Sequence, residues 1–131
     1  MEKKIRHLEM IQNIVVRMGN NSFLLKGWSV TLVSAIFAIT IQEKARNFMA
    51  LAFFPAFIFW ALDGFYLWQE RLFRAHYDYV RNLDEEQIDF SMKIDQAISA
   101  QTTWVKAVFA DITVLFHVSI LVAISIVLIV F

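Results

Sequence analysis

The chain contains no cysteine, a single proline and only three glycines among its 131 residues. The absence of cysteine excludes disulfide bonds, thiolate chemistry and zinc–thiolate sites, and it leaves the redox state of the compartment undetermined. A glycine-rich phosphate loop, an HExxH helix and a nucleophile elbow are also missing from the sequence. We therefore expect a protein that is not an enzyme and that holds neither a cofactor nor a metal.

Charge is scarce and evenly balanced. Twelve basic and twelve acidic residues give a formal net charge of zero, and charged residues make up 18% of the chain, against about 25% in soluble proteins. A balanced chain has no global attraction to nucleic acid, so we expect no nucleic-acid partner. Hydrophobic residues reach 59%, and little sequence remains for a soluble domain with its own core.

The longest run without a formal charge covers residues 112–131 and reads ITVLFHVSILVAISIVLIVF. As a helix it would be about 30 Å long, which is the thickness of the hydrocarbon core of a bilayer. Two further apolar segments cover residues 23–41 and 48–68, with a tight polar turn at 42–47 between them. The sequence therefore predicts three transmembrane helices, the first of which we expect to be retained as a signal anchor.

Residues 1–20 have an amphipathic pattern, because apolar side chains recur at every third or fourth position. The apolar side carries Ile5, Leu8, Ile11, Val15 and Met18. This helix could lie on the inner membrane surface or pack against the protein's own cytoplasmic part. We favour the second, because three spans already anchor the chain. Gly19 and the polar residues up to Ser22 are expected to end the helix before the first span.

The helical pattern of the second span continues beyond the membrane to about Asn82, and a returning helix is expected from Ser91 into the third span. Between them, Asp84 and Gln87 have the spacing of a capping box. We therefore predict an all-α membrane protein with an N-terminal amphipathic helix and three transmembrane helices. In this fold, spans two and three extend into a cytoplasmic helical hairpin over residues 69–110.

The basic residues are distributed unevenly along the chain. Five lie within residues 1–26, five within 69–110 and two within 42–47, whereas none follows the third span. Basic residues concentrate on the cytoplasmic side of membrane proteins. We therefore expect the N-terminus and residues 69–110 in the cytoplasm, and the C-terminal Phe131 on the outside.

Three ionisable residues lie within or at the edge of the spans, namely Lys26, Asp63 and His117. Each is fourteen or fifteen residues from the outer end of its span, or about 21–23 Å, so the three form one polar layer close to the inner interface. Such residues usually face a partner or water. The polar layer has two interpretations. It could be functional, as a proton or ion relay or a ligand-sensing cluster. It could instead be a structural clamp in which Lys26 neutralises Asp63. We favour the clamp.

Small and hydroxyl side chains allow membrane helices to approach closely. In the first span, Thr31, Ser34 and Ala38 share one face. No single span carries a continuous polar stripe, so a pore would have to be assembled from several copies, with this face as its lining or packing surface. In the second span, Pro55 lacks a backbone N–H and is expected to kink the helix.

Two stretches carry a resemblance, NNSFLLKGWSVTL at residues 20–32 and LDGFYLWQERLFRAHYD at residues 62–78. They resemble a group of small bacterial inner-membrane proteins with three membrane helices, over most of the chain. The resemblance implies a bacterial inner-membrane location.

The sequence leaves two functions open. The first is a homo-oligomeric membrane protein that forms a pore or perturbs the membrane, by analogy of build with effectors in phage defence or stress. The alternative is a membrane anchor or regulatory subunit that docks a soluble cytoplasmic partner. An intramembrane enzyme or transporter is disfavoured, because three spans hold too few polar groups.

Overall fold

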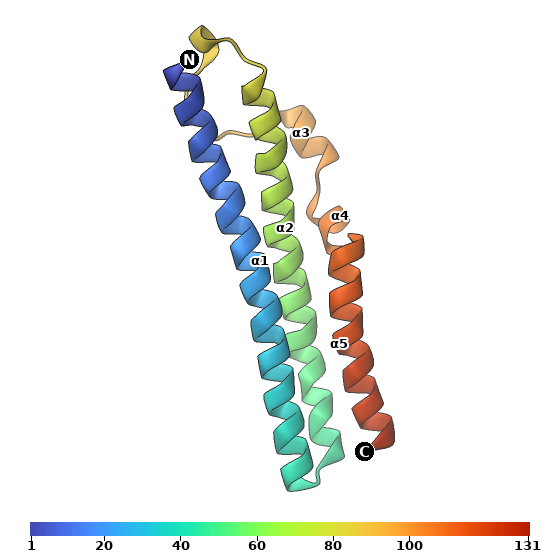
Figure 1. Cartoon of the computed structure of the whole chain (residues 1–131). Coiled ribbons are helices and arrows are strands. Elements are labelled where there is room, and N and C mark those ends of the chain that lie inside the picture. The colour runs from blue at the N-terminus through green and yellow to red at the C-terminus, as the bar shows by residue number, and fades with distance from the viewer.

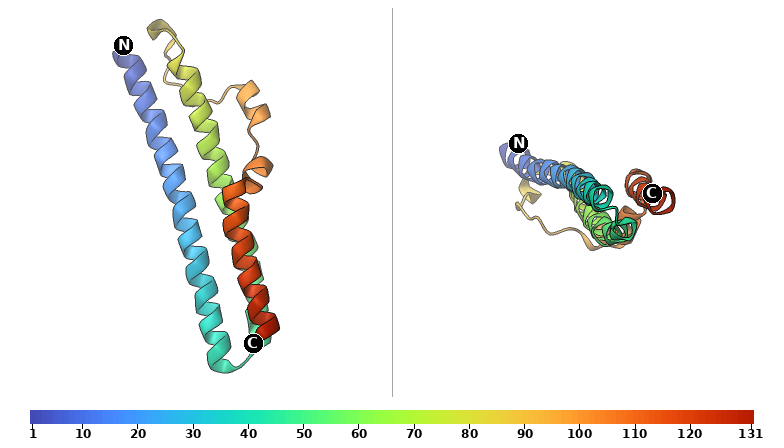
Figure 2. Two further views of the ribbon diagram at one scale, coloured as in Figure 1. Left: turned by 45° about the vertical axis from the view of Figure 1, so that its right-hand side comes forward. Right: turned by 90° about the horizontal axis from the view of Figure 1, so that it is seen from below.

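The computed structural model describes residues 1–131, and the chain is helical apart from its connections (Figure 1). The elements in chain order are α1 (Glu2–Glu43), the 3-10 helix η1 (Arg46–Ala52), α2 (Phe53–Arg81), the 3-10 helix η2 (Glu85–Gln87), α3 (Gln96–Gln101), α4 (Trp104–Val108) and α5 (Asp111–Val130). In Figures 1 and 2, α1 and α2 form a long antiparallel pair, and α5 runs beside the half that contains their connecting turn. The N-terminus lies at one end of the bundle and the C-terminus at the other.

Three helical stretches are long and apolar enough to cross a membrane, namely Glu2–Glu43, Arg46–Arg81 and Asp111–Val130. The predicted all-helical fold with three apolar helices is therefore confirmed. Helices suit this role because each backbone N–H and C=O finds its partner within the same segment, so none is left unsatisfied in hydrocarbon.

α1 is one helix of 42 residues. The predicted break between an amphipathic helix at 1–20 and a span at 23–41 was wrong. Gly19 has no positive φ, and the hydroxyl of Ser22 donates to Asp63 rather than to a helix end. Glycine within a helix costs only about 1 kcal/mol, and continuous packing on α2 outweighs this cost.

Two apolar clusters hold the helices together at opposite ends of the bundle. The cluster near the N-terminus joins the amphipathic face of α1 to the end of α2, and its buried members are Ile11, Val15, Val80 and Ile88. The cluster near the C-terminus joins η1, α2 and α5, and its buried members are Met49, Ala52, Ala56 and Ile124. In a bilayer, lipid tails would be as apolar as these side chains, so the second cluster would depend on close packing around small alanines rather than on exclusion of water.

Pro55 lies in the first turn of α2 and not within a longer α-helix, as the predicted span at 48–68 implied, and the predicted kink stays a prediction. It is the third residue of α2, directly after the 3-10 helix η1. In the first turn of an α-helix the backbone N–H has no helical partner, and proline is tolerated there. The missing N–H of Pro55 therefore falls at the change from 3-10 to α geometry.

The connection from α2 to α5 differs most from the prediction. α2 ends at Arg81, close to the expected Asn82, and Asp84 and Gln87 form the expected capping box. The prediction of a returning helix from Ser91 was wrong, because residues 88–95 are not helical. This segment, called the strap below, crosses from η2 to α3. The long helical hairpin outside the apolar spans is instead made by α1 and α2.

Local side-chain hydrogen bonds explain why the strap does not form a helix. A carboxylate oxygen of Asp89 accepts from the Ser91 amide at 3.0 Å, and the hydroxyl of Ser91 accepts from the Lys93 amide at 3.1 Å. Such bonds compete with helical ones. Phe90 between them has a φ of 57°, a left-handed conformation that interrupts any right-handed helix.

Three indole N–H groups fasten the returning segment and α2 to each other. Trp60 and Trp68 on α2 donate to the carbonyls of Val108 and Thr102, each at 2.9 Å. In the opposite direction, Trp104 donates to the carbonyl of Ala61 at 3.0 Å. The first two bonds satisfy backbone carbonyls at the ends of α4 and α3, and the third reaches a carbonyl within α2. Together they hold a segment that was expected to be one continuous helix.

Glu85 joins the start of α1 to the connection after α2. Its carboxylate accepts from the amides of Lys3 at 2.9 Å and Lys4 at 3.3 Å, and it pairs with the Met1 ammonium at 2.5 Å. The hydrogen bond from this ammonium is the main reason why the pKa of Glu85 lies below its ordinary value of 4.5.

Glu85→Gln should therefore fray the first turn of α1 at pH 7 and raise hydrogen exchange at the amides of Lys3 and Lys4 several-fold. A lowered carboxyl pKa stabilises the fold above the ordinary value of 4.5, and that contribution is lost as the pH falls through the lowered pKa. Exchange in the native protein should therefore approach that of the variant in acid. Glu86→Gln, at the exposed neighbouring position, is the control and should leave exchange unchanged at both pH values.

Candidate intramembrane polar site

The structure brings the three residues of the polar layer together, although they come from α1, α2 and α5. The Lys26 ammonium lies 2.6 Å from Oδ2 of Asp63, and Nε2 of His117 lies 2.7 Å from the same oxygen. Asp63 is fully buried and His117 is 2% exposed, whereas the Lys26 side chain is 20% exposed. One carboxylate therefore joins all three of the helices that are long and apolar enough to cross a membrane.

Ser22 is a further member of the site that the sequence did not reveal. Its hydroxyl donates to Oδ1 of Asp63, and it accepts from the Lys26 ammonium at 2.9 Å. Ser22 lies one helical turn before Lys26 on the same face of α1. That spacing could have identified it, but the expected helix end at Ser22 assigned the residue to a cap.

Aromatic rings enclose the imidazole of His117. Trp60 stacks on it with a centroid distance of 5.9 Å and an interplanar angle of 6°, and Phe116 meets it edge-on at 5.0 Å. The Lys26 ammonium lies 5.9 Å from the centroid of the Phe116 ring, within the range of a cation–π contact. Asp63 itself is fully buried, and the exclusion of water strengthens its electrostatic interactions.

The arrangement fixes the role of each polar atom. A carboxylate oxygen only accepts, so Nε2 of His117 carries a hydrogen and donates it to Asp63. With His117 neutral, Lys26 and Asp63 cancel in charge, and the site is neutral as a whole. The site therefore consists of one carboxylate oxygen that accepts from both Lys26 and His117.

Two hydroxyl groups extend polar character beyond this cluster. Ser29 on α1 and Thr113 on α5 are fully buried, and their hydroxyl oxygens have no hydrogen-bond partner. Thr113 lies one turn before His117 on α5. Sequence reasoning missed both residues, because uncharged hydroxyls in an apolar run give no distinctive signal.

The face formed by Thr31, Ser34 and Ala38 is separate from the polar site. All three residues are exposed on the single chain, whereas the buried side of α1 carries Ser29 and Thr40. The hydroxyl of Thr31 donates to the carbonyl of Gly27 at 2.9 Å, one turn earlier. Within one chain, this face has no helix packed against it.

Comparison with protein-family models, curated proteins and solved structures gives no match. The resemblance to small bacterial inner-membrane proteins therefore stays a prediction, and the function is argued from the geometry alone.

Proposed function

We propose that the chain is a multi-pass protein of the bacterial inner membrane that assembles into a homo-oligomer. The assembly forms or gates a pore, or otherwise perturbs the bilayer, as an effector in phage defence or stress. The N-terminus lies in the cytoplasm and the C-terminus outside.

The distribution of charge along the bundle supports this orientation. Ten of the twelve basic residues belong to residues 1–26 and 69–110. In Figure 1 the N-terminus and the connection after α2 lie at the same end, and the turn between α1 and η1 lies at the opposite end with the C-terminus. A bundle with this polarity follows the positive-inside rule if the N-terminal end faces the cytoplasm.

The proposal of a homo-oligomer rests on the face of α1, within the first apolar span, that has no helix packed against it. Thr31, Ser34 and Ala38 are exposed on the single chain, and small residues are typical of membrane helix interfaces. The interior offers no polar path, because Met49, Ala52, Ala56 and Ile124 fill it on the C-terminal side of the polar layer. A pore therefore forms between copies, with this face as the lining or the contact.

The polar layer acts in this proposal as a clamp that keeps the three helices of each copy together. A relay would need proton-carrying groups that continue on both sides of Asp63, and the neighbouring buried hydroxyls of Ser29 and Thr113 have no partner through which a proton could pass. A neutral pair of Lys26 and Asp63, with His117 donating to the carboxylate, fits a structural role.

Cysteine cross-linking tests the assembly, because the native chain has no cysteine. Ser34→Cys should give a covalent dimer when native membranes are treated with an oxidant, since two copies of this face meet or lie close together. Ile39→Cys is the control: it is also exposed at 45%, but it points about 140° away from Ser34 around the helix. Equal cross-linking of both variants would contradict the proposed face.

Tryptophan substitutions on this face and at the control position connect assembly to activity. Overproduction of the native chain should arrest growth and dissipate the membrane potential, as reported by a potential-sensitive dye. Ala38→Trp should prevent both effects, because a large ring on this face blocks close approach of helices, whereas Ile39→Trp should leave both intact. A monomer in mild detergent, with an intact potential after strong induction, would overturn the pore.

The connection after α2 favours a second candidate, a membrane anchor or regulatory subunit that docks a soluble cytoplasmic partner. It exposes aromatic side chains, with Phe90 at 39%, Trp104 at 44% and Phe109 at 64% exposure. Exposed aromatic residues are enriched at binding surfaces. The outcome that overturns the pore, a monomer that leaves the potential intact, is the one this candidate predicts.

A further inference from the structure

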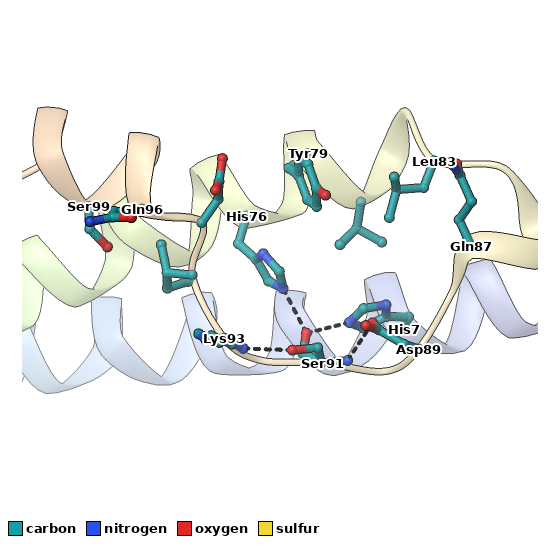
Figure 3. Close-up of a pocket in the computed structure, with 13 residues that line it drawn as sticks. His7, His76, Tyr79, Leu83, Gln87, Asp89, Ser91, Lys93, Gln96 and Ser99 are labelled. Carbon is teal, nitrogen blue, oxygen red and sulfur yellow. Dashed lines mark hydrogen bonds between the residues drawn. The ribbon is translucent and has the colours of Figure 1, made fainter.

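Four polar side-chain atoms are buried without a hydrogen-bond partner, and none of them can meet a bound molecule. In the cavity beside the strap (Figure 3), His7 and His76 turn their Nε2 atoms to the Ser91 carbonyl, and their Nδ1 atoms are buried. The hydroxyl oxygens of Ser29 and Thr113 are buried as well. A site for a ligand therefore has to use a polar group that reaches the surface.

The Lys26 ammonium is such a group, because one of its hydrogens is unused. An ammonium carries three hydrogens, all of which can be donated. Oδ2 of Asp63 lies 2.6 Å from the nitrogen and the hydroxyl of Ser22 lies 2.9 Å from it, which leaves the third hydrogen without an oxygen acceptor in the chain. The Lys26 side chain is 20% exposed and lines a groove on the surface of the bundle.

This groove lies between α1 and α5, which stand apart in the end-on view of Figure 2. Its volume is about 490 Å³, and Lys26 is the only α1 residue in its lining. The other lining residues form one face of α5 from Ile112 to Ala123, a length of about 17 Å. The two helices meet at the C-terminal end of the bundle, where the ring centroids of Phe37 and Phe131 are 6.1 Å apart.

The lining is apolar apart from Lys26 and Ser119. The hydroxyl of Ser119 donates to the carbonyl of Leu115 at 2.6 Å, so its hydrogen is already used. No acidic residue lines the groove. The groove therefore offers one hydrogen-bond donor beside an apolar surface, which suits an apolar chain that carries an acceptor at the level of Lys26.

The charges around Lys26 favour a neutral acceptor over an anion. Asp63 already balances the charge of Lys26, and its carboxylate lies 2.6 Å from the same ammonium. An anionic group that approached this ammonium would be repelled by the buried carboxylate, and such repulsion is strong where water is excluded. A carbonyl oxygen accepts a hydrogen bond without adding a charge.

The size of the groove favours a single hydrocarbon chain over another helix. A helix with its side chains is about 10–12 Å in diameter, so a segment about 17 Å long would occupy at least roughly 1,300 Å³. The groove holds about 490 Å³, which is too little for a helix and leaves room for a much narrower chain. In a bilayer, phospholipids supply such chains, and an ester carbonyl joins each of them to glycerol.

We propose that the groove binds one acyl chain of a bilayer phospholipid, and that the ester carbonyl of this chain accepts a hydrogen bond from Lys26. The chain lies along Ser119, Ile120 and Ala123, and in the proposed orientation the lipid belongs to the cytoplasmic leaflet. The inference rests on the proposed membrane location but not on the pore, because the groove lies within a single copy.

Native mass spectrometry of the full chain, released from a mild detergent, tests the site with two competing lipids. Both are glycerophosphoethanolamine lipids with chains of equal length, but one is ester-linked and the other is ether-linked and lacks the carbonyl. The chain should retain the ester lipid about fivefold more tightly, the difference expected from one hydrogen bond. Equal retention, which recognition of the phosphate or general adherence of lipid would give, would overturn the proposal.

Three variants locate the bound lipid. Lys26→Met should abolish the preference for the ester lipid, and Ala123→Trp should displace both lipids because the indole fills the groove. The matched control is Val122→Trp, at an exposed position about 100° away around α5, which should retain both lipids and the preference. A preference that survives Lys26→Met, or equal loss in the two tryptophan variants, would place the lipid elsewhere and overturn the proposal. A monomeric protein should give the same results, so failure of the pore is distinguishable from failure of this site.

Discussion

Lys26→Met combined with His117→Leu should destabilise the protein by more than the sum of the two single substitutions. Asp63 is fully buried, and both residues contact its Oδ2 atom, at 2.6 and 2.7 Å. Either single variant leaves one partner on that oxygen and should cost about 1.5 kcal/mol. The double variant leaves the buried carboxylate without a cation and with only the Ser22 hydroxyl as a donor, which should cost about 5 kcal/mol, so the coupling is about 2 kcal/mol.

The free energy of unfolding, measured by SDS titration in mixed micelles, tests this coupling. Adding Asp63→Asn to the double variant should recover most of the loss, because the stranded charge is then removed. Asp63→Asn alone strands the Lys26 ammonium and should destabilise, whereas Asp63→Asn with Lys26→Met should be milder. Strict additivity of Lys26→Met and His117→Leu would show that the two side chains do not share Asp63.

Gly64→Ala should detach α4 from α2 and destabilise the bundle by about 1–3 kcal/mol, the usual cost of overpacking. A Cβ atom at Gly64 would lie 2.4 Å from Cγ2 of Val108 and 3.0 Å from its backbone Cα. The Val108 carbonyl is also the acceptor for Trp60 at 2.9 Å, so displacement of Val108 breaks that bond as well. Increased protease cleavage within residues 102–110, together with the unfolding free energy, reports the effect.

Gly19→Ala is the matched control for Gly64→Ala. Its Cβ would lie 3.7 Å from a carboxylate oxygen of Glu70, an ordinary contact. Alanine is favoured over glycine within helices by about 1 kcal/mol, so this variant should be at least as stable as the native chain. Similar losses in both variants would assign the effect to helix chemistry in general rather than to the contact with Val108.

Some of these features could be anticipated from the sequence, and the reason is simple geometry. An uncharged run such as residues 112–131 has few alternatives to a membrane helix, and a constant rise per residue allowed the relative depths of Lys26, Asp63 and His117 to be compared. The common depth of the three residues could therefore be predicted from the sequence, because depth depends only on the position of a residue along its span.

The remaining features depend on contacts between distant segments. Gly19 is compatible with both a helix end and a helix interior, and packing on α2 selects the second. The strap follows from local bonds around Ser91 and from its carbonyl meeting His7 and His76, which are 84 and 15 residues away. The role of Ser22 likewise depended on knowing that α1 is continuous.

Because α1 is continuous, it can tilt as one rigid body. At about 1.5 Å per residue the helix is about 63 Å long, and Lys26 lies near its middle, 24 residues from Glu2 and 17 from Glu43. The contact of Lys26 with Asp63 therefore divides α1 into two segments of about 36 and 26 Å, and it is the point about which the helix would tilt. If α1 tilts as a rigid rod, a displacement of about 3 Å at its N-terminal end moves the far turn by about 2 Å in the opposite direction. A displacement at the strap would then reach the opposite end of α1 without any change inside the helix itself.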